Sequence, residues 1–281
     1  MFRLMFAAGT ALVLTAGAAS AYDVLPHEAA AEKIRIVEPQ LRIASGGPAA
    51  PQVALTLDAC MGRTDMRILD VLVKNRIPAT IFVTGRWVRG NPEALSVLKA
   101  NPDLFQIENH GAMHVPAITN VPRMYNIKTA GSVDAVRSEI DGGAKAITDA
   151  RAPKPVWYRD ATARYSTDAV KLATSMGYKI GGYSLNGDMG ASLLAGAAER
   201  RIAAARDGDV IIAHINQPGR AAGAGVAKGI LALKAKGMRF VRLGDVQTTM
   251  TLNPVLQPNL QAKATNPGQD IHAGKPVVVR K

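Results

Sequence analysis

Two histidines four residues apart are the clearest sign of chemistry in this sequence. On a helical turn, His110 and His114 would place both imidazoles on one side, within reach of one ion. Two neutral nitrogens and a carboxylate, with positions left open for water, are typical of a catalytic metal site. The pair alone is weak support, because a structural or surface role explains the same spacing.

Further ionisable residues follow short apolar segments elsewhere in the chain. In a barrel of parallel strands, catalytic side chains gather at the carboxyl ends of the strands. An acid, an arginine and a third histidine are therefore expected at the same rim as the histidine pair. The residues at these segment ends are Asp58, Arg159, Asp160, Asp188 and His214.

The segments that must position these residues alternate between two periodicities. Short, β-branched apolar runs predict strands near 52–57, 79–83, 104–108, 156–158, 180–184, 209–213 and 239–243. Longer segments of helical period predict helices near 64–75, 92–100, 133–149, 166–176, 192–206 and 224–236. This order predicts an α/β fold, a distorted or partly open (β/α) barrel with about seven parallel strands.

Composition divides the chain into four parts. Residues 1–21 have a basic start, an apolar run and a small-residue cleavage pattern, which predict a signal peptide and export to the periplasm or extracellular space. An uncleaved membrane anchor is the alternative, although Gly and Thr interrupt the run. Residues 22–50 are interpreted as an N-terminal arm, 51–246 as the core domain, and the polar residues 247–281 as a flexible or surface-bound tail.

The formal net charge of +12 favours residence beside anionic polymers or lipid head groups. It does not indicate nucleic acid binding, because the basic residues are scattered through helical segments rather than gathered with aromatics. No segment after the signal is long enough for stable membrane insertion. The single cysteine, Cys60, cannot form an internal disulfide. It is either a small buried residue or, when ionised, a zinc ligand.

Taken together, the residues at these segment ends resemble the motifs of the polysaccharide deacetylase family, of the NodB-homology or carbohydrate esterase family 4 type. The resemblance runs from about Gln52 to Val246. Five segments carry it, in the order of the family's motifs: Val53–Asp58, Asn109–Pro116, Tyr158–Arg159, Asp188 and Ile211–His214.

The resemblance implies hydrolysis of N-acetyl groups on an acetylated polysaccharide or oligosaccharide, assisted by a divalent ion, expected to be Zn, with Co or Mn as alternatives. His110 and His114 would bind the ion, and Asp58 would act as general base and contact the ion. His214 would be the general acid, with Asp188 orienting its imidazole. Arg159 would fix Asp58 and lower its pKa.

The sequence departs from the family in its first motif. The family commonly has a second Asp that binds metal, and here Ala59 stands in its place, followed by Cys60. If the site differs from the family's site only by the loss of this metal ligand, a carboxylate introduced at residue 59 should point at the two histidines. The departure leaves open a cell-wall binding protein that has lost its metal, and O-acetyl ester hydrolysis is the alternative among enzymes.

Several of these residues also have structural interpretations. Arg159 could form a rim ion pair with Asp160, and Asp160 could replace the missing carboxylate. Asp188 could cap a helix or shape a turn. Among the aromatics, Trp157 and Tyr158 are expected in the core, whereas Trp87 is the better candidate for stacking on a sugar.

Overall fold

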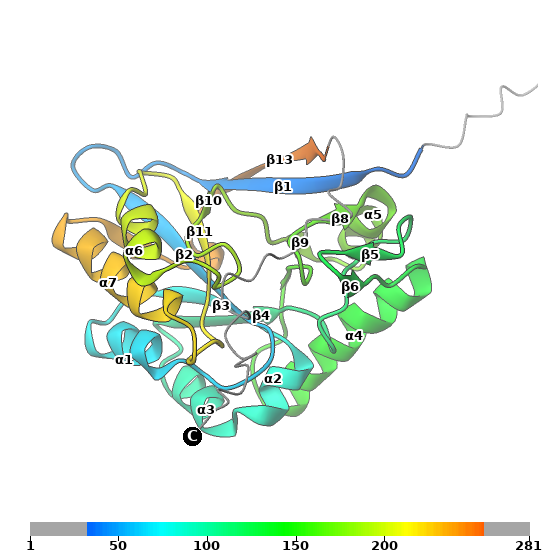
Figure 1. Ribbon diagram of the computed structural model, residues 1–281, viewed down its shortest axis with the longest axis horizontal. Coiled ribbons are helices and arrows are strands. Elements are labelled where there is room, and N and C mark those ends of the chain that lie inside the picture. The colour runs from blue at the N-terminus through cyan, green and yellow to red at the C-terminus, as the bar shows by residue number, and fades with distance from the viewer. Residues whose placement is uncertain (1–32, 256–281) are drawn as a thin grey trace, which may run out of the picture. The chain divides into compact units, whose positions relative to one another are not determined.

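The computed structural model describes residues 33–255 (Figure 1). The expected signal peptide lies outside these residues, as do the first part of the arm and the end of the tail. Within them, the central sheet has eight strands, all paired in parallel. Along the sheet they run β10 (Leu185–Asn186), β11 (Val210–His214), β2 (Gln52–Ala59), β3 (Ala79–Val83), β4 (Phe105–Asn109), β7 (Trp157–Tyr158) and β9 (Lys179–Ile180), and β12 (Arg239–Val241) pairs with β2.

The sheet curls into a half-barrel, which confirms the predicted partly open (β/α) barrel. Helices cover its outer face (Figure 1). They are α1 (Met66–Lys74), α2 (Gly85–Gly90), α3 (Pro92–Ala100), α4 (Val133–Asp149), α5 (Thr167–Ser175), α6 (Ala195–Ala203) and α7 (Ala222–Ala235), with a short 3₁₀ turn at Leu243–Asp245. All six predicted helices are present. No helix in the described range is long and apolar enough to cross a bilayer.

The alternation of side chains along β2 separates the core from the site. Leu55, Leu57 and Ala59 belong to the largest apolar cluster, which also contains side chains of α1 and α7. Because successive strand residues face opposite sides, Asp58 faces the interior of the curled sheet instead. Ala59 is fully buried in the core. The expectation that a carboxylate at residue 59 would point at the histidines is therefore wrong.

A second, small sheet contains parts of the segments that were expected to be an N-terminal arm and a flexible or surface-bound tail. β1 (Ile36–Ile43) pairs antiparallel with β13 (Thr248–Pro254) and with β8 (Tyr165–Ser166). β1 alternates buried Leu41 and Ile43 with exposed residues, as a half-buried strand should. Every residue of β13 after Thr248 is exposed, so its pairing rests on backbone hydrogen bonds that leave no apolar pattern in the sequence. The segment predicted as tail thus begins as a strand. A further short hairpin joins β5 (Arg123–Met124) to β6 (Ile127–Lys128).

Asp207 fastens the turn between β1 and β2 to the loop before β11. Its carboxylate accepts hydrogen bonds from the backbone N–H groups of Gln52 at 2.8 Å, Gly46 at 2.9 Å and Gly47 at 3.0 Å, and from the Ser45 hydroxyl. The hydrogen bond from Gln52, followed by those from Ser45 and Gly46, holds the pKa of Asp207 well below its usual range. A carboxyl whose pKa is lowered on folding stabilises the fold above its unfolded pKa, and this stabilisation is lost as the pH falls.

Replacing Asp207 with Asn should therefore destabilise the protein most near neutral pH. The difference in unfolding free energy between wild type and Asp207→Asn should shrink as the pH falls below about 4, the unfolded pKa of Asp. Urea unfolding at several pH values measures this difference. Asp70→Asn, which removes a half-exposed carboxylate from a weak helix pair with Lys74, is the control. A difference for Asp207→Asn that does not change with pH would contradict the prediction.

Candidate metal and catalytic site

The predicted residues come together at the carboxyl ends of the strands. Asp58 and Cys60 lie at the end of β2, and His110 follows β4. Arg159 follows β7, and His214 ends β11, where it lies opposite Asp58 in the register of the sheet. Parallel pairing from β11 through β2, β3 and β4 to β7 brings these ends to one edge, as expected for a barrel of this kind.

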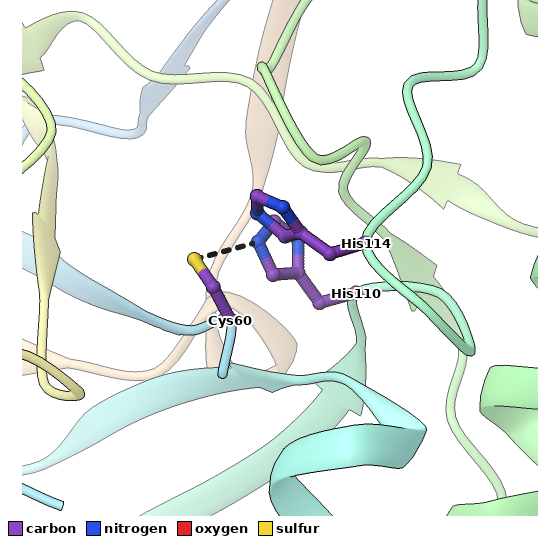
Figure 2. Close-up of side chains that lie close together, drawn as sticks. All are labelled: Cys60, His110 and His114. Atoms are coloured by element: carbon purple, nitrogen blue, oxygen red, sulfur yellow. Dashed lines mark hydrogen bonds between the residues drawn. The ribbon is translucent and has the colours of Figure 1, made fainter. Parts of the chain in front are cut away.

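Three of these side chains form a group that could hold a metal ion. The ligand atoms of Cys60, His110 and His114 all lie within 4.8 Å of one another. In Figure 2 the Cys60 sulfur faces the two imidazoles, which cross edge to face with centroids 5.1 Å apart. The Cys60 Sγ atom is 3.5 Å from His110 Nε2. One sulfur and two imidazole nitrogens are ligands that zinc accepts.

The two imidazoles are arranged as metal ligands usually are. His110 Nδ1 is 2.8 Å from the carbonyl oxygen of Arg159, so a proton on Nδ1 leaves the Nε2 lone pair free for an ion. His114 Nε2 is buried and has no hydrogen-bond partner among the described residues. A buried, unpaired nitrogen is costly unless something binds it. Both observations fit an ion between these side chains.

Charges within the group reinforce one another. Burial acts to raise the pKa of the Cys60 thiol, but the charge of His110 and the hydrogen bonds of the neighbouring histidines together lower that pKa well below its usual value. Burial would lower the pKa of His110, but the charges of Asp58 and Cys60 raise it to about 9. In the metal-free protein the two groups thus resemble a thiolate and imidazolium pair, and a cation that binds there takes the place of the proton.

The histidine pair lies on a loop, not on the helical turn expected from its spacing. Gly111 and His114 have positive φ angles of 86° and 67°, which a helix does not allow. The backbone N–H groups of Met113 and Val115 donate to Glu139 Oε1 of α4, at 2.8 and 3.0 Å. A Cβ at Gly111 would come within 2.5 Å of the same carboxylate oxygen. Glu139 therefore shapes the loop, a role that no pattern in the sequence indicates.

Asp58 is paired with Arg159 deep in the site. Asp58 Oδ1 accepts from Arg159 Nη1 at 2.8 Å, and Oδ2 lies 3.9 Å from His110 Nε2. Arg159 is fully buried and also donates to the carbonyl oxygens of Gly181 and Gly182. Burial acts to raise the pKa of Asp58, but Arg159, and then His110, hold it below its usual value. The carboxylate is thus ionised near neutral pH, with one oxygen held by Arg159.

Asp160 has a structural role, different from the ion pair with Arg159 and from the metal ligation that the sequence suggested. Its carboxylate accepts from the backbone N–H groups of Ala117 and Thr162 and from the Thr162 hydroxyl. It therefore ties down the loop after His114 and does not belong to the Cys60 group. The pairing of Arg159 with Asp160 is wrong, because the guanidinium is taken by Asp58 and two carbonyls.

His214 is paired with the carboxylate of Asp188. Its Nδ1 lies 3.0 Å from Asp188 Oδ1 and 3.2 Å from Oδ2, and its backbone N–H donates to Asp188 Oδ2 at 2.7 Å. Burial would lower the pKa of His214, but the negative charge of Asp188 raises it well above its usual value. The imidazole is therefore protonated near neutral pH and held in one orientation. Asp188 also shapes a turn, since its carbonyl accepts from Ser192 N at 3.1 Å.

Trp87 is not placed to stack on a sugar, contrary to the expectation from the sequence. Trp87 is only 1% exposed and packs in the largest apolar cluster, because it lies on the inner side of α2. Trp157 and Tyr158 are buried, as predicted. Two exposed apolar side chains are sequence neighbours of site residues: Met113, between the two histidines, and Met189, next to Asp188, are each 49% exposed.

The fold and these side chains define an α/β-barrel protein with a Cys-His-His group, an Asp-Arg pair and a His-Asp pair at one edge of its sheet. Residues 45–181, just under half of the chain, match the family described as polysaccharide deacetylase. This match confirms the resemblance expected from the sequence.

Individual relatives are distant. Uncharacterized protein YlxY of Bacillus subtilis (strain 168) is 25% identical over 132 residues, which cover 47% of this chain and 37% of that protein. The chain thus matches little more than a third of this relative's length.

Solved structures share the fold at a similar distance. One is BA3943 of Bacillus anthracis, described as a pseudoenzyme of carbohydrate esterase family 4, with 22% identity and a TM-score of 0.56 over 72% of this chain and 67% of that one. Another is the Bc1960 peptidoglycan N-acetylglucosamine deacetylase, with 23% identity and a TM-score of 0.59 over 73% of this chain and 90% of that one. These likenesses establish the fold.

Proposed function

We propose that the protein is a metal-dependent hydrolase that removes N-acetyl groups from amino-sugar units of a cell-wall or extracellular polysaccharide. The observation that carries this proposal is the pairing of opposite charge states on neighbouring strands. Ionised Asp58 on β2 lies opposite protonated His214 on β11, beside a Cys-His-His group. Amide hydrolysis needs a base, an acid and a means of stabilising developing negative charge.

The residues divide this work according to their contacts. A bound divalent ion would polarise the acetyl carbonyl and acidify water. Asp58, with Oδ1 held by Arg159, uses its other oxygen to accept the proton of the attacking water. As the C–N bond breaks, His214 gives its proton to the departing amine. The products are acetate and the free amino sugar, and Asp188 keeps the imidazole oriented throughout.

Relatives supply the substrate class in this proposal. The Bc1960 protein is described as a peptidoglycan N-acetylglucosamine deacetylase, and PdaC of Bacillus subtilis as a peptidoglycan deacetylase. The half-exposed Met113 and Met189 offer apolar surface beside the site for the face of a sugar ring. The net charge of +12 and the export expected from residues 1–21 suit an enzyme that works among anionic wall polymers outside the cytoplasm.

Acetate release tests the proposal directly. The purified protein is incubated with N-acetylated chitooligosaccharide, peptidoglycan and O-acetylated xylan, before and after chelation and after zinc is restored. Acetate from the amino-sugar substrates that stops on chelation and returns with zinc supports the proposal. Release from xylan alone would make the protein an O-acetyl esterase. Binding of wall polymer without any release would make it a pseudoenzyme, as BA3943 is described to be.

Replacing Asp188 with Asn should lower turnover about 10²-fold, the lower end of what a positioned acid contributes. The amide can still accept a hydrogen bond from His214, but it no longer stabilises the imidazolium by charge. The measurement is kcat on N-acetylated chitooligosaccharide. Asp149→Asn, which removes an exposed carboxylate from a helix pair with Lys145, should keep full turnover. Turnover of Asp188→Asn equal to that of the control would exclude this role.

A further inference from the structure

Cys60 is buried but lies outside the packed apolar clusters of the described residues. It is 6% exposed, yet it lies in none of the apolar clusters formed by the described residues, whereas its neighbour Ala59 packs in the largest one. Its sulfur faces His110 and His114 (Figure 2). The interpretation of Cys60 as a small core residue therefore does not describe its surroundings.

The geometry also explains how this chain manages without an acid at residue 59. The direction of β2 sends the Ala59 side chain into the core and away from the histidines. The chain leaves the strand after Ala59, and the side chain of the next residue, Cys60, places its Sγ atom 3.5 Å from His110 Nε2. A thiolate supplies the same single negative charge as a carboxylate, and it is a softer ligand.

We propose that Cys60, His110 and His114 form a zinc site with one sulfur and two nitrogen ligands, in which the Cys60 thiolate replaces the missing carboxylate. This inference rests on the metal dependence in the proposed function and adds the identity of the third ligand. Binding forms a bond from the Cys60 sulfur to zinc, and the proton that the Cys60 and His110 pair holds in the metal-free protein goes to solvent. Asp58 lies outside this group, so it serves as a base and not as a ligand.

A sulfur ligand changes which metal the protein selects. Thiolate and imidazole ligands favour zinc over manganese more strongly than a carboxylate and two imidazoles do. The wild-type protein should therefore take up zinc from an equimolar mixture of zinc and manganese. Cys60→Asp, which supplies a carboxylate at the same residue, should still bind an ion but discriminate less between the two.

Cobalt substitution tests the ligand without reference to catalysis. The full chain is stripped with a chelator and titrated with Co²⁺, whose bond to a thiolate produces charge-transfer absorption in the near ultraviolet. We expect this band to saturate at about one equivalent in the wild type and to be absent from Cys60→Ser and Cys60→Asp. In competition with a chromogenic chelator, Cys60→Ser should bind zinc at least about 100-fold more weakly, since even a residue that only supports a ligand accounts for 10–100-fold.

Met113→Ala is the matched control, because Met113 is also a sulfur-containing residue and lies on the loop that carries both histidines. Its side chain is exposed, so its removal should leave both the absorption band and zinc affinity unchanged. Thermal unfolding of each metal-free variant shows whether the fold is kept. For Cys60→Ser, the change of one buried atom should leave the unfolding transition cooperative.

The outcomes separate this inference from the proposed function. A thiolate band with no acetate release upholds the zinc site and overturns the enzyme. Acetate release with no band in the wild type, and zinc affinity unchanged in Cys60→Ser, overturns the sulfur ligand and leaves the enzyme standing. Failure of the wild type to bind either ion overturns the site.

Discussion

Replacing Asp58 with Asn is expected to lower the rate of acetate release by about 10²–10⁴-fold, the range that a general base contributes. Asn keeps the shape of the side chain and can still accept a hydrogen bond from Arg159, but its amide cannot take a proton from water near neutral pH. The bound zinc should remain, because Asp58 lies outside the Cys-His-His group. Initial rates and metal content are measured on the same sample.

The same change should also destabilise the fold. Arg159 is fully buried, and Asp58 is the carboxylate that neutralises it. Removing one partner of a buried ion pair costs about 3–5 kcal/mol, because the other charge is left uncompensated. The rate must therefore be expressed per folded molecule, with the folded fraction taken from urea unfolding.

Asp160→Asn provides the matched control for this experiment. Asp160 is also a fully buried carboxylate near the site, but it accepts hydrogen bonds from backbone N–H groups and a threonine hydroxyl. Its replacement should cost stability while the rate per folded molecule changes far less than in Asp58→Asn. Equal rates per folded molecule in Asp58→Asn and in wild type would exclude Asp58 as the base.

Removal of either histidine should abolish activity and metal binding together. His110→Ala and His114→Ala each delete one of three ligands, so zinc content should fall from about one ion per chain to nearly none. His114→Ala is the cleaner experiment, because His114 Nε2 has no hydrogen bond to lose, whereas His110 also contacts the Arg159 carbonyl. Elemental analysis after equilibration with zinc gives the stoichiometry.

Met113→Ala again serves as the control, since it alters the loop between the two histidines without removing a ligand. It should retain its zinc. If His110→Ala and His114→Ala kept the zinc content of this control, the metal would have to lie elsewhere in the protein.

The sequence predicts those parts of the fold in which burial and periodicity coincide. β2, β3 and β11 are buried on both faces and appear as continuous apolar runs. The helix α2 was missed because it has six residues with glycine at both ends, too few to show a helical period. β13 was missed because it is exposed and held by backbone hydrogen bonds, which do not depend on side-chain type.

The sequence likewise predicts some parts of the site and not others. Positions at strand ends could be predicted, since a parallel sheet brings those ends together, and the contacts of Arg159 with Asp58 and of His214 with Asp188 were both expected. Their catalytic roles stay predictions. Glu139 acts across a long separation in sequence, through backbone N–H groups that no residue pattern reveals. The side of the sheet to which the Ala59 and Cys60 side chains point depends on where β2 ends. Strand ends are the positions that sequence patterns predict least well.

The small sheet of β13, β1 and β8 also constrains the order in which the chain can fold. Val37 pairs with Pro254, so nearly the whole described chain lies between two adjacent residues of this sheet. Contacts between such distant segments form late, because the entropy of closing the loop must be overcome first, and they slow folding. During synthesis, β1 emerges first of these strands and lacks its longest partner until β13 has been made. For that interval the β1 edge is an unpaired strand, open to association with other extended chains.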